Sequence, residues 1–138
     1  MMEDEINYFN NYISLNEQIR YLKWSLLWTK GEYHRWKSNE ISIVGIDRDN
    51  QIRKLDKEII RIETQLEILI KRKLDMLNMM NIFEGVNRQI VQLKYIEGMT
   101  TTEISEITSY SISYIQKKHV EIKNILKYVM KYQSQLST

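Results

Sequence analysis

The sequence has no cysteine and no proline, and only four of its 138 residues are glycine. The lack of cysteine excludes disulfides and thiolate metal sites. The lack of proline and the scarcity of glycine remove the commonest helix breakers and leave little material for hairpin turns. These absences favour an all-α fold.

Long apolar runs are also lacking, since no stretch reaches the roughly 18 consecutive apolar residues that a membrane-spanning helix needs. The N-terminal residues do not join a basic segment to an apolar run and a cleavage site, as a secretory signal does. We therefore expect a cytoplasmic chain with no membrane partner.

Motifs of catalysis are missing as well. The sequence contains no glycine-rich phosphate loop, nucleophile elbow or catalytic dyad. The two histidines, His34 and His119, are far apart and have no companions at metal-ligand spacing. We expect no enzyme activity, no cofactor and no metal site.

Charge is distributed unevenly, although the net charge is only +2. Five lysines near the C-terminal end are accompanied by a single acid, Glu121; they are Lys117, Lys118, Lys123, Lys127 and Lys131. This pattern is typical either of a surface that meets phosphates or of an ordinary solvated helix face.

The N-terminal half contains two helical patterns. Apolar residues recur at helical spacing from about Glu3 to Trp28, and Trp24 and Trp28 share one face, which indicates a core or an interface rather than base stacking. Residues 31–48 lack a clean period and are expected to form a connection, with a short strand at residues 41–46 as an option.

The second pattern runs from Gln51 to Phe83 in alternating three- and four-residue steps, which predicts a long helix with a heptad seam. Lys73 occupies one core position of this seam. Its apolar positions are Ile52, Leu55, Ile59, Ile62, Leu66, Leu69, Met76, Met80 and Phe83. The seam packs either on the N-terminal helix of the same chain or on a second copy.

After Gly85 the pattern changes to shorter helices. A helix is expected over residues 86–96, ending at Gly98. Thr100 and Glu103 fit a capping box, which predicts a helix start at Thr101, and Ser111 is the expected N-cap of a last long helix. Two helices joined by a tight turn, with polar residues opening the second, are what a reader of the DNA major groove requires.

Residues 88–100, with Glu103-Ile104 and residues 111–115, resemble the region-four helix-turn-helix of sigma factors, especially the form in phage late-gene transcription activators of the RinA and ArpU type. The resemblance covers about 45 residues, and the heptad-rich helix ahead of them is arranged as in those activators. Two positions depart from the pattern: Ser105 stands where alanine is common, and Tyr110 where glycine often supplies the turn.

The resemblance implies a role for individual side chains. The expected contacts to base edges are Ile112, Ser113, Gln116 and Lys117. The expected contacts to the DNA backbone are Thr100, Thr101, Thr102, Ser111, Tyr114, Lys118 and Lys123. The implied function is sequence-specific binding of double-stranded DNA and activation of phage or mobile-element late genes with the host RNA polymerase, in the bacterial cytoplasm.

We accordingly expect a helical oligomerisation region over residues 1–84 and a DNA-binding domain over residues 86–138. A regulator that reads two half-sites gains from association, so we expect a dimer or tetramer. The predicted interface is Ile52, Leu55, Ile59, Ile62, Leu66, Leu69 and Met76. The alternatives are a DNA-recognition subunit of a packaging machine and a coiled-coil adaptor that binds only protein.

Overall fold

The computed structural model describes residues 9–38 and 46–136, and every regular element among them is a helix. The all-α prediction is therefore confirmed for these residues. The elements in chain order are α2 (Tyr12–Lys37), α3 (Ile46–Met80), α4 (Gly85–Val91), the π-helix η1 (Gln92–Ile96), α5 (Thr101–Thr108) and α6 (Ile112–Leu136). The optional strand at residues 41–46 lies outside the described residues except for Ile46, which begins α3. None of the described helices is both long and apolar enough to cross a membrane.

The chain forms two compact units. One is Asn16–Arg72, and the other combines residues 9–15 with residues 73–136. This division differs from the expected boundary at residue 85. Residues 9–15 belong with the C-terminal part, where Phe9 packs on two aromatic rings. Its ring centroid lies 6.1 Å from that of Phe83 and 5.2 Å from that of Tyr95.

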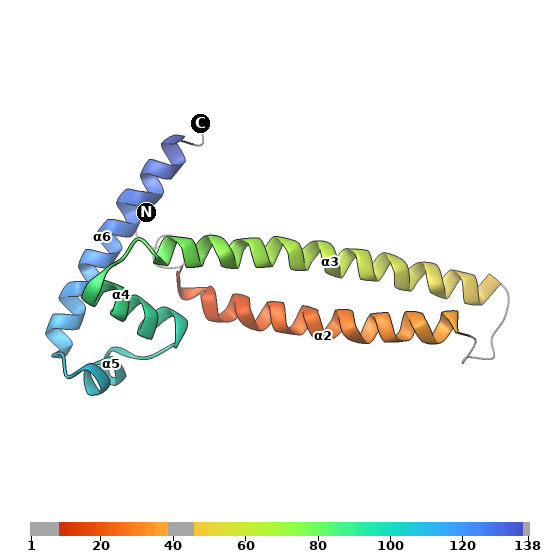
Figure 1. Cartoon of the computed structure of the whole chain (residues 1–138), viewed down its shortest axis with the longest axis horizontal. Coiled ribbons are helices and arrows are strands. Elements are labelled where there is room, and N and C mark those ends of the chain that lie inside the picture. The colour runs from red at the N-terminus through yellow and green to blue at the C-terminus, as the bar shows by residue number, and fades with distance from the viewer. Residues whose placement is uncertain (1–8, 39–45, 137–138) are drawn as a thin grey trace. The chain divides into compact units, whose positions relative to one another are not determined.

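In the first unit, α2 and α3 lie side by side and run in opposite directions (Figure 1). Along α2, buried or half-buried residues recur in alternating three- and four-residue steps at Ile19, Leu22, Leu26, Thr29, Tyr33 and Trp36. Thr29 is buried with its hydroxyl donating to the Ser25 carbonyl at 2.7 Å, so this polar group is satisfied within its own helix.

The end of α2 is tied to the start of α3 by one side chain. The Arg48 guanidinium donates to the carbonyl oxygens of Trp36 and Lys37 at 3.0 and 2.9 Å. Carbonyls in the last turn of a helix have no partner within that helix. Arg48 therefore completes the C-terminus of α2.

The heptad seam of α3 is buried within the chain. Ile59, Ile62, Leu66, Leu69 and Met76 are each at most 9% exposed, and Ile52 and Leu55 are half-buried. An apolar stripe that its own chain largely covers leaves little surface for a second copy. The burial therefore favours the intramolecular alternative, and association through this seam stays a prediction.

Two helix boundaries also differ from the expected ones. Helix α2 continues to Lys37 instead of ending near Trp28, because Tyr33 and Trp36 extend its packed face beyond Gly31. Helix α3 begins at Ile46 rather than Gln51. Its first turn contains Asp47 and Asp49, whose charges suit the positive end of the helix dipole.

In the second unit, α4 and α5 pack against α6 (Figure 1). All four C-terminal helical elements contribute to one core. The buried residues that these elements contribute to the core are Ile90 and Val91 of α4, Tyr95 of η1, Ile104 of α5, and Ile115, Ile122 and Leu126 of α6. This core fixes α6 through one face and leaves the other face open.

Candidate nucleic-acid interface

Helix α5 begins with the capping box that the sequence predicted. The Thr100 hydroxyl accepts from the Glu103 amide at 3.2 Å, and the Glu103 carboxylate accepts from the Thr100 amide at 3.3 Å. Both bonds satisfy amide groups that a helix start would otherwise leave unpaired. The predicted helix start at Thr101 is confirmed.

The connection between α5 and α6 is a three-residue turn, residues 109–111. Ser109 adopts the left-handed conformation with φ 65°, so the turn does not require glycine at Tyr110. The Ser105 hydroxyl donates to the Tyr110 carbonyl at 2.6 Å, and the Tyr110 hydroxyl donates to Gln89 of α4 at 3.3 Å. The two residues that depart from the sigma-factor pattern therefore hold the turn in place.

Ser111 caps α6, as expected. Its hydroxyl accepts from the Tyr114 amide at 3.1 Å, and its carbonyl accepts from the Ile115 amide at 3.0 Å. The start of α6 is thus set by local hydrogen bonds, and its direction is set by Ile115, which is buried in the core.

The four residues predicted to meet base edges are brought together by this start. Ile112, Ser113, Gln116 and Lys117 are all exposed, whereas Ile115 between them is 2% exposed. At 100° per residue the four occupy one side of the first two turns. They offer an apolar group, a hydroxyl, an amide and an ammonium, the groups that distinguish base pairs in the major groove.

The residues predicted to meet the DNA backbone are less uniform. Thr100 and Ser111 are exposed, but their hydroxyls already act as helix caps. Lys118 is half-buried, lies 5.6 Å above the Tyr114 ring and forms an ion pair with Glu121 at 3.2 Å. Its charge is thus partly neutralised within the chain.

The remaining members of that predicted set also differ in exposure. Thr102 is exposed, whereas Thr101, Tyr114 and Lys123 are half-buried. Tyr114 packs on Tyr110 with 5.2 Å between ring centroids. These residues flank the start of α5, the turn and one side of α6 rather than forming a single cluster.

Exposed cations continue along α6. Lys117, Lys127 and Lys131 are exposed, and the one acid in the sequence of α6, Glu121, is bound to Lys118. The exposed side of α6 therefore combines polar residues at its start with positive charge further along.

Helices η1 and α6 bring together Lys94, Tyr95, His119 and Lys123, a cluster that the sequence did not predict. Burial and the nearby Lys123 ammonium lower the pKa of Lys94. Burial, together with Lys94 and Lys123, lowers the pKa of His119 to about 4, and burial raises the pKa of Tyr95 to about 12. The Tyr95 hydroxyl and His119 Nε2 are hydrogen-bonded, and their rings stack.

His119 is therefore neutral near pH 7, while two lysines add positive charge beside it. No signal in the sequence joins residue 94 to residues 119 and 123, because packing of η1 on α6 brings them together. Among the described residues no group of three or more His, Cys, Asp or Glu side chains could hold a metal ion.

No protein-family model, no curated protein and no solved structure matches this chain. The interpretation of the α6 surface therefore depends on its residues and their geometry.

Proposed function

We propose that this protein is a sequence-specific regulator of transcription that binds double-stranded DNA with the first turns of α6 in the major groove. The observation that carries the proposal is the exposure of Ile112, Ser113, Gln116 and Lys117 on one side of a capped helix start. In this proposal α5, the turn and α6 act as a helix-turn-helix.

The dimensions and chemistry of the two partners support this assignment. The major groove admits one α-helix, and the N-terminal residues of a recognition helix contact its base edges. Glutamine can bond adenine, lysine can bond guanine, and isoleucine can touch the thymine methyl. The exposed Lys127 and Lys131 add charge without base preference.

The role in transcription follows from the resemblance to sigma region four and to phage late-gene activators. On this basis the protein activates late genes of a phage or mobile element with the host RNA polymerase in a bacterial cytoplasm. The capped starts of α5 and α6 fall at the positions that the resemblance requires, which supports this extension.

Selection of bound duplexes from a random DNA pool, at near-physiological salt, tests the proposal. The parent should enrich one motif, because specific sites exceed non-specific binding by ~10³ or more. Lys117→Glu should lose this enrichment. Lys71→Glu makes the same charge change at an exposed position of α3 and should keep it.

The same selection separates base contacts from backbone contacts. Gln116→Ala should relax preference at one base position, at a cost of roughly 1–3 kcal/mol for the correct base. Lys127→Ala should weaken binding to all sequences alike and reduce the salt dependence of affinity. If the unsubstituted protein is folded but enriches no motif, the alternative of an adaptor that binds only protein is favoured. If Lys71→Glu loses the enrichment as fully as Lys117→Glu does, the result argues against α6 as the DNA-binding helix.

A further inference from the structure

Helix α2 carries large apolar side chains that its own unit does not cover. Tyr21 is 65% exposed, Trp24 61%, Leu27 73% and Trp28 58%. They occupy positions between the seam residues that face α3, so they belong to the outer side of the helical pair. We call these four residues, together with Gly31, the aromatic face.

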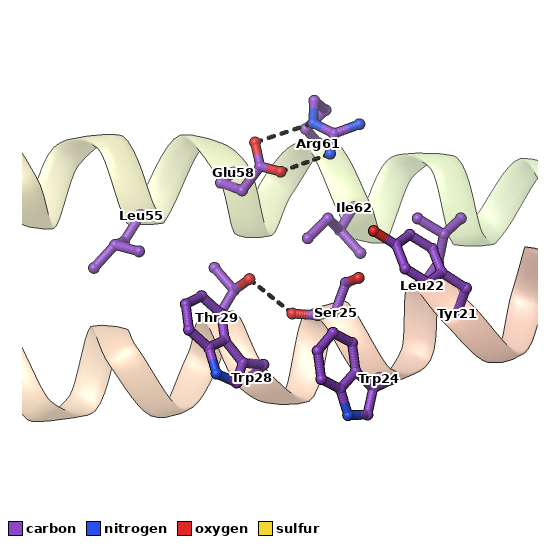
Figure 2. Close-up of a pocket in the computed structure, with 10 residues that line it drawn as sticks. All are labelled: Tyr21, Leu22, Trp24, Ser25, Trp28, Thr29, Leu55, Glu58, Arg61 and Ile62. Carbon is purple, nitrogen blue, oxygen red and sulfur yellow. Dashed lines mark hydrogen bonds and ion pairs between the residues drawn. The ribbon is translucent and has the colours of Figure 1, made fainter.

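The aromatic face borders a groove between α2 and α3, with a volume of ≈ 390 Å³ (Figure 2). Leu55 and Ile62 of α3 lie toward the space between the helices, while Trp24 and Trp28 extend from α2 beside it. The groove thus continues the exposed aromatic surface instead of forming a closed cavity.

The exposed area is close to what association requires. Aromatic side chains bury roughly 150–250 Å² each when covered, so four large residues at these exposures present on the order of 500 Å². A standard protein interface takes ~800 Å² from each partner. The aromatic face alone would supply more than half of one partner's share, and the groove beside it adds further surface.

Gly31 supplies a second argument. It lies within α2, is exposed, and a Cβ placed there would meet no atom within 4 Å. Glycine inside a helix is unfavourable relative to alanine, and no contact among the residues that the structure describes requires it here. It follows Trp24 by seven residues and Trp28 by three, and thus shares their side of α2. A bare backbone at this place allows a second helix to approach closely.

The charges beside the groove favour a second copy of this chain over a nucleic acid as the partner. Arg61 and Glu58 form a pair with 2.6 Å between nitrogen and oxygen, and the hydrogen bond from Arg61 lowers the pKa of Glu58. The pair carries no net charge, so it does not attract phosphates. In a two-fold arrangement the same surface meets itself, and each half of the pair can meet its opposite from the other copy.

We propose that the aromatic face is the docking surface for a second copy of this chain. This surface lies within Asn16–Arg72 and centres on the outer side of α2. Of the heptad seam of α3, only Leu55 and Ile62 line the adjoining groove. The inference goes beyond DNA binding and does not depend on it.

Sedimentation of the full chain without DNA, over a concentration series, tests the inference. The parent should shift from monomer to dimer with rising concentration. Changing Trp24→Glu and Trp28→Glu together should raise the dimer dissociation constant by roughly a hundredfold or more, since buried tryptophans at interfaces each contribute over about 1 kcal/mol. Helix content and thermal stability should stay close to the parent values, because both rings are exposed.

Ile60→Glu is the matched control. Ile60 lies on α3, is 57% exposed and does not line the groove, so this variant should associate like the parent. A parent that stays monomeric throughout would overturn the inference. Association that survives the double tryptophan change, or that Ile60→Glu removes, would do the same. Lys117→Glu should leave the dimer dissociation constant unchanged. The sedimentation result therefore tests the docking surface whether or not the DNA-binding proposal is correct.

Discussion

Gly98 lies in the connection before α5 and combines two constraints. Its φ is +72°, and an added Cβ would come within 2.8 Å of the Ile13 side chain. A left-handed backbone costs a residue with a Cβ about 1–2 kcal/mol, and the partly exposed end of the Ile13 side chain must also shift, which adds little. Gly98→Ala should therefore lower the free energy of unfolding by about 1–2 kcal/mol, measured by urea titration.

Gly85 provides the comparison, because its φ is +60° and an added Cβ would meet nothing within 4 Å. Gly85→Ala should show only the backbone cost. If both substitutions lower the free energy of unfolding equally, the close approach of the new Cβ to Ile13 adds no cost at Gly98.

His119 makes stability depend on pH. The unfolded imidazole takes up a proton near its usual pKa of 6.5, whereas the folded one does so only near about 4. Between these values the unfolded state binds more protons, so this contribution to stability is complete above about pH 6.5 and is lost as the pH falls toward about 4.

The melting temperature of the parent should thus fall between about pH 7.5 and about pH 5. His119→Gln should show a smaller fall, because glutamine does not titrate while the carboxylates remain in both proteins. Parallel falls in the two proteins would contradict the burial of a neutral His119 against Tyr95.

At the scale of the element, the capped starts of α5 and α6 were easier to predict than the start of α3, the end of α2 or the packing partners of the helices. The capping box at Thr100 and the cap at Ser111 are hydrogen bonds between residues three apart, so the local sequence contains both partners. The end of α2 depended instead on Tyr33 and Trp36 packing beyond Gly31, which is a tertiary effect. The residues exposed at the start of α6 follow from its cap and its 3.6-residue period.

The π-helix η1 could not be anticipated in this way. The Glu97 amide donates to the Gln92 carbonyl five residues earlier, at 3.1 Å. The apolar spacing over residues 86–96 indicated one uninterrupted α-helix. One extra residue in a turn changes which side chains face α6, and Lys94 and Tyr95 reach their places beside His119 in this segment.

The seam of α3 supplies a prediction at this scale. Leu69 is 2% exposed, whereas its neighbour Ile70 is 36% exposed. Leu69→Ala should lower the free energy of unfolding by about 2–5 kcal/mol, because it removes buried methyl groups and leaves a cavity. Ile70→Ala should cost much less. Urea unfolding of both variants checks the difference.

The result also distinguishes a core position from a subunit contact. A Leu69→Ala variant that unfolds like the parent but dissociates more readily would place the seam between subunits. We expect the reverse, because Leu69 is already buried within its own chain.

At the scale of the whole molecule, the two proposed surfaces belong to different compact units. The residues proposed to read DNA lie within residues 73–136, and the aromatic face lies within residues 16–72. A substitution in one surface therefore leaves the other available for measurement. This separation lets sedimentation and DNA selection test the two proposals independently in the same protein.

The all-α fold, the starts of α5 and α6, and the polar surface at the beginning of α6 were determined by the sequence alone. They depend on composition, on helical periodicity and on hydrogen bonds between near neighbours. Only the tertiary structure decided that α2 covers the seam of α3, that Trp24 and Trp28 remain exposed, and that His119 meets Tyr95. Periodicity shows that a helix has an apolar face, but the partner that buries this face is chosen by contacts between residues far apart in the chain.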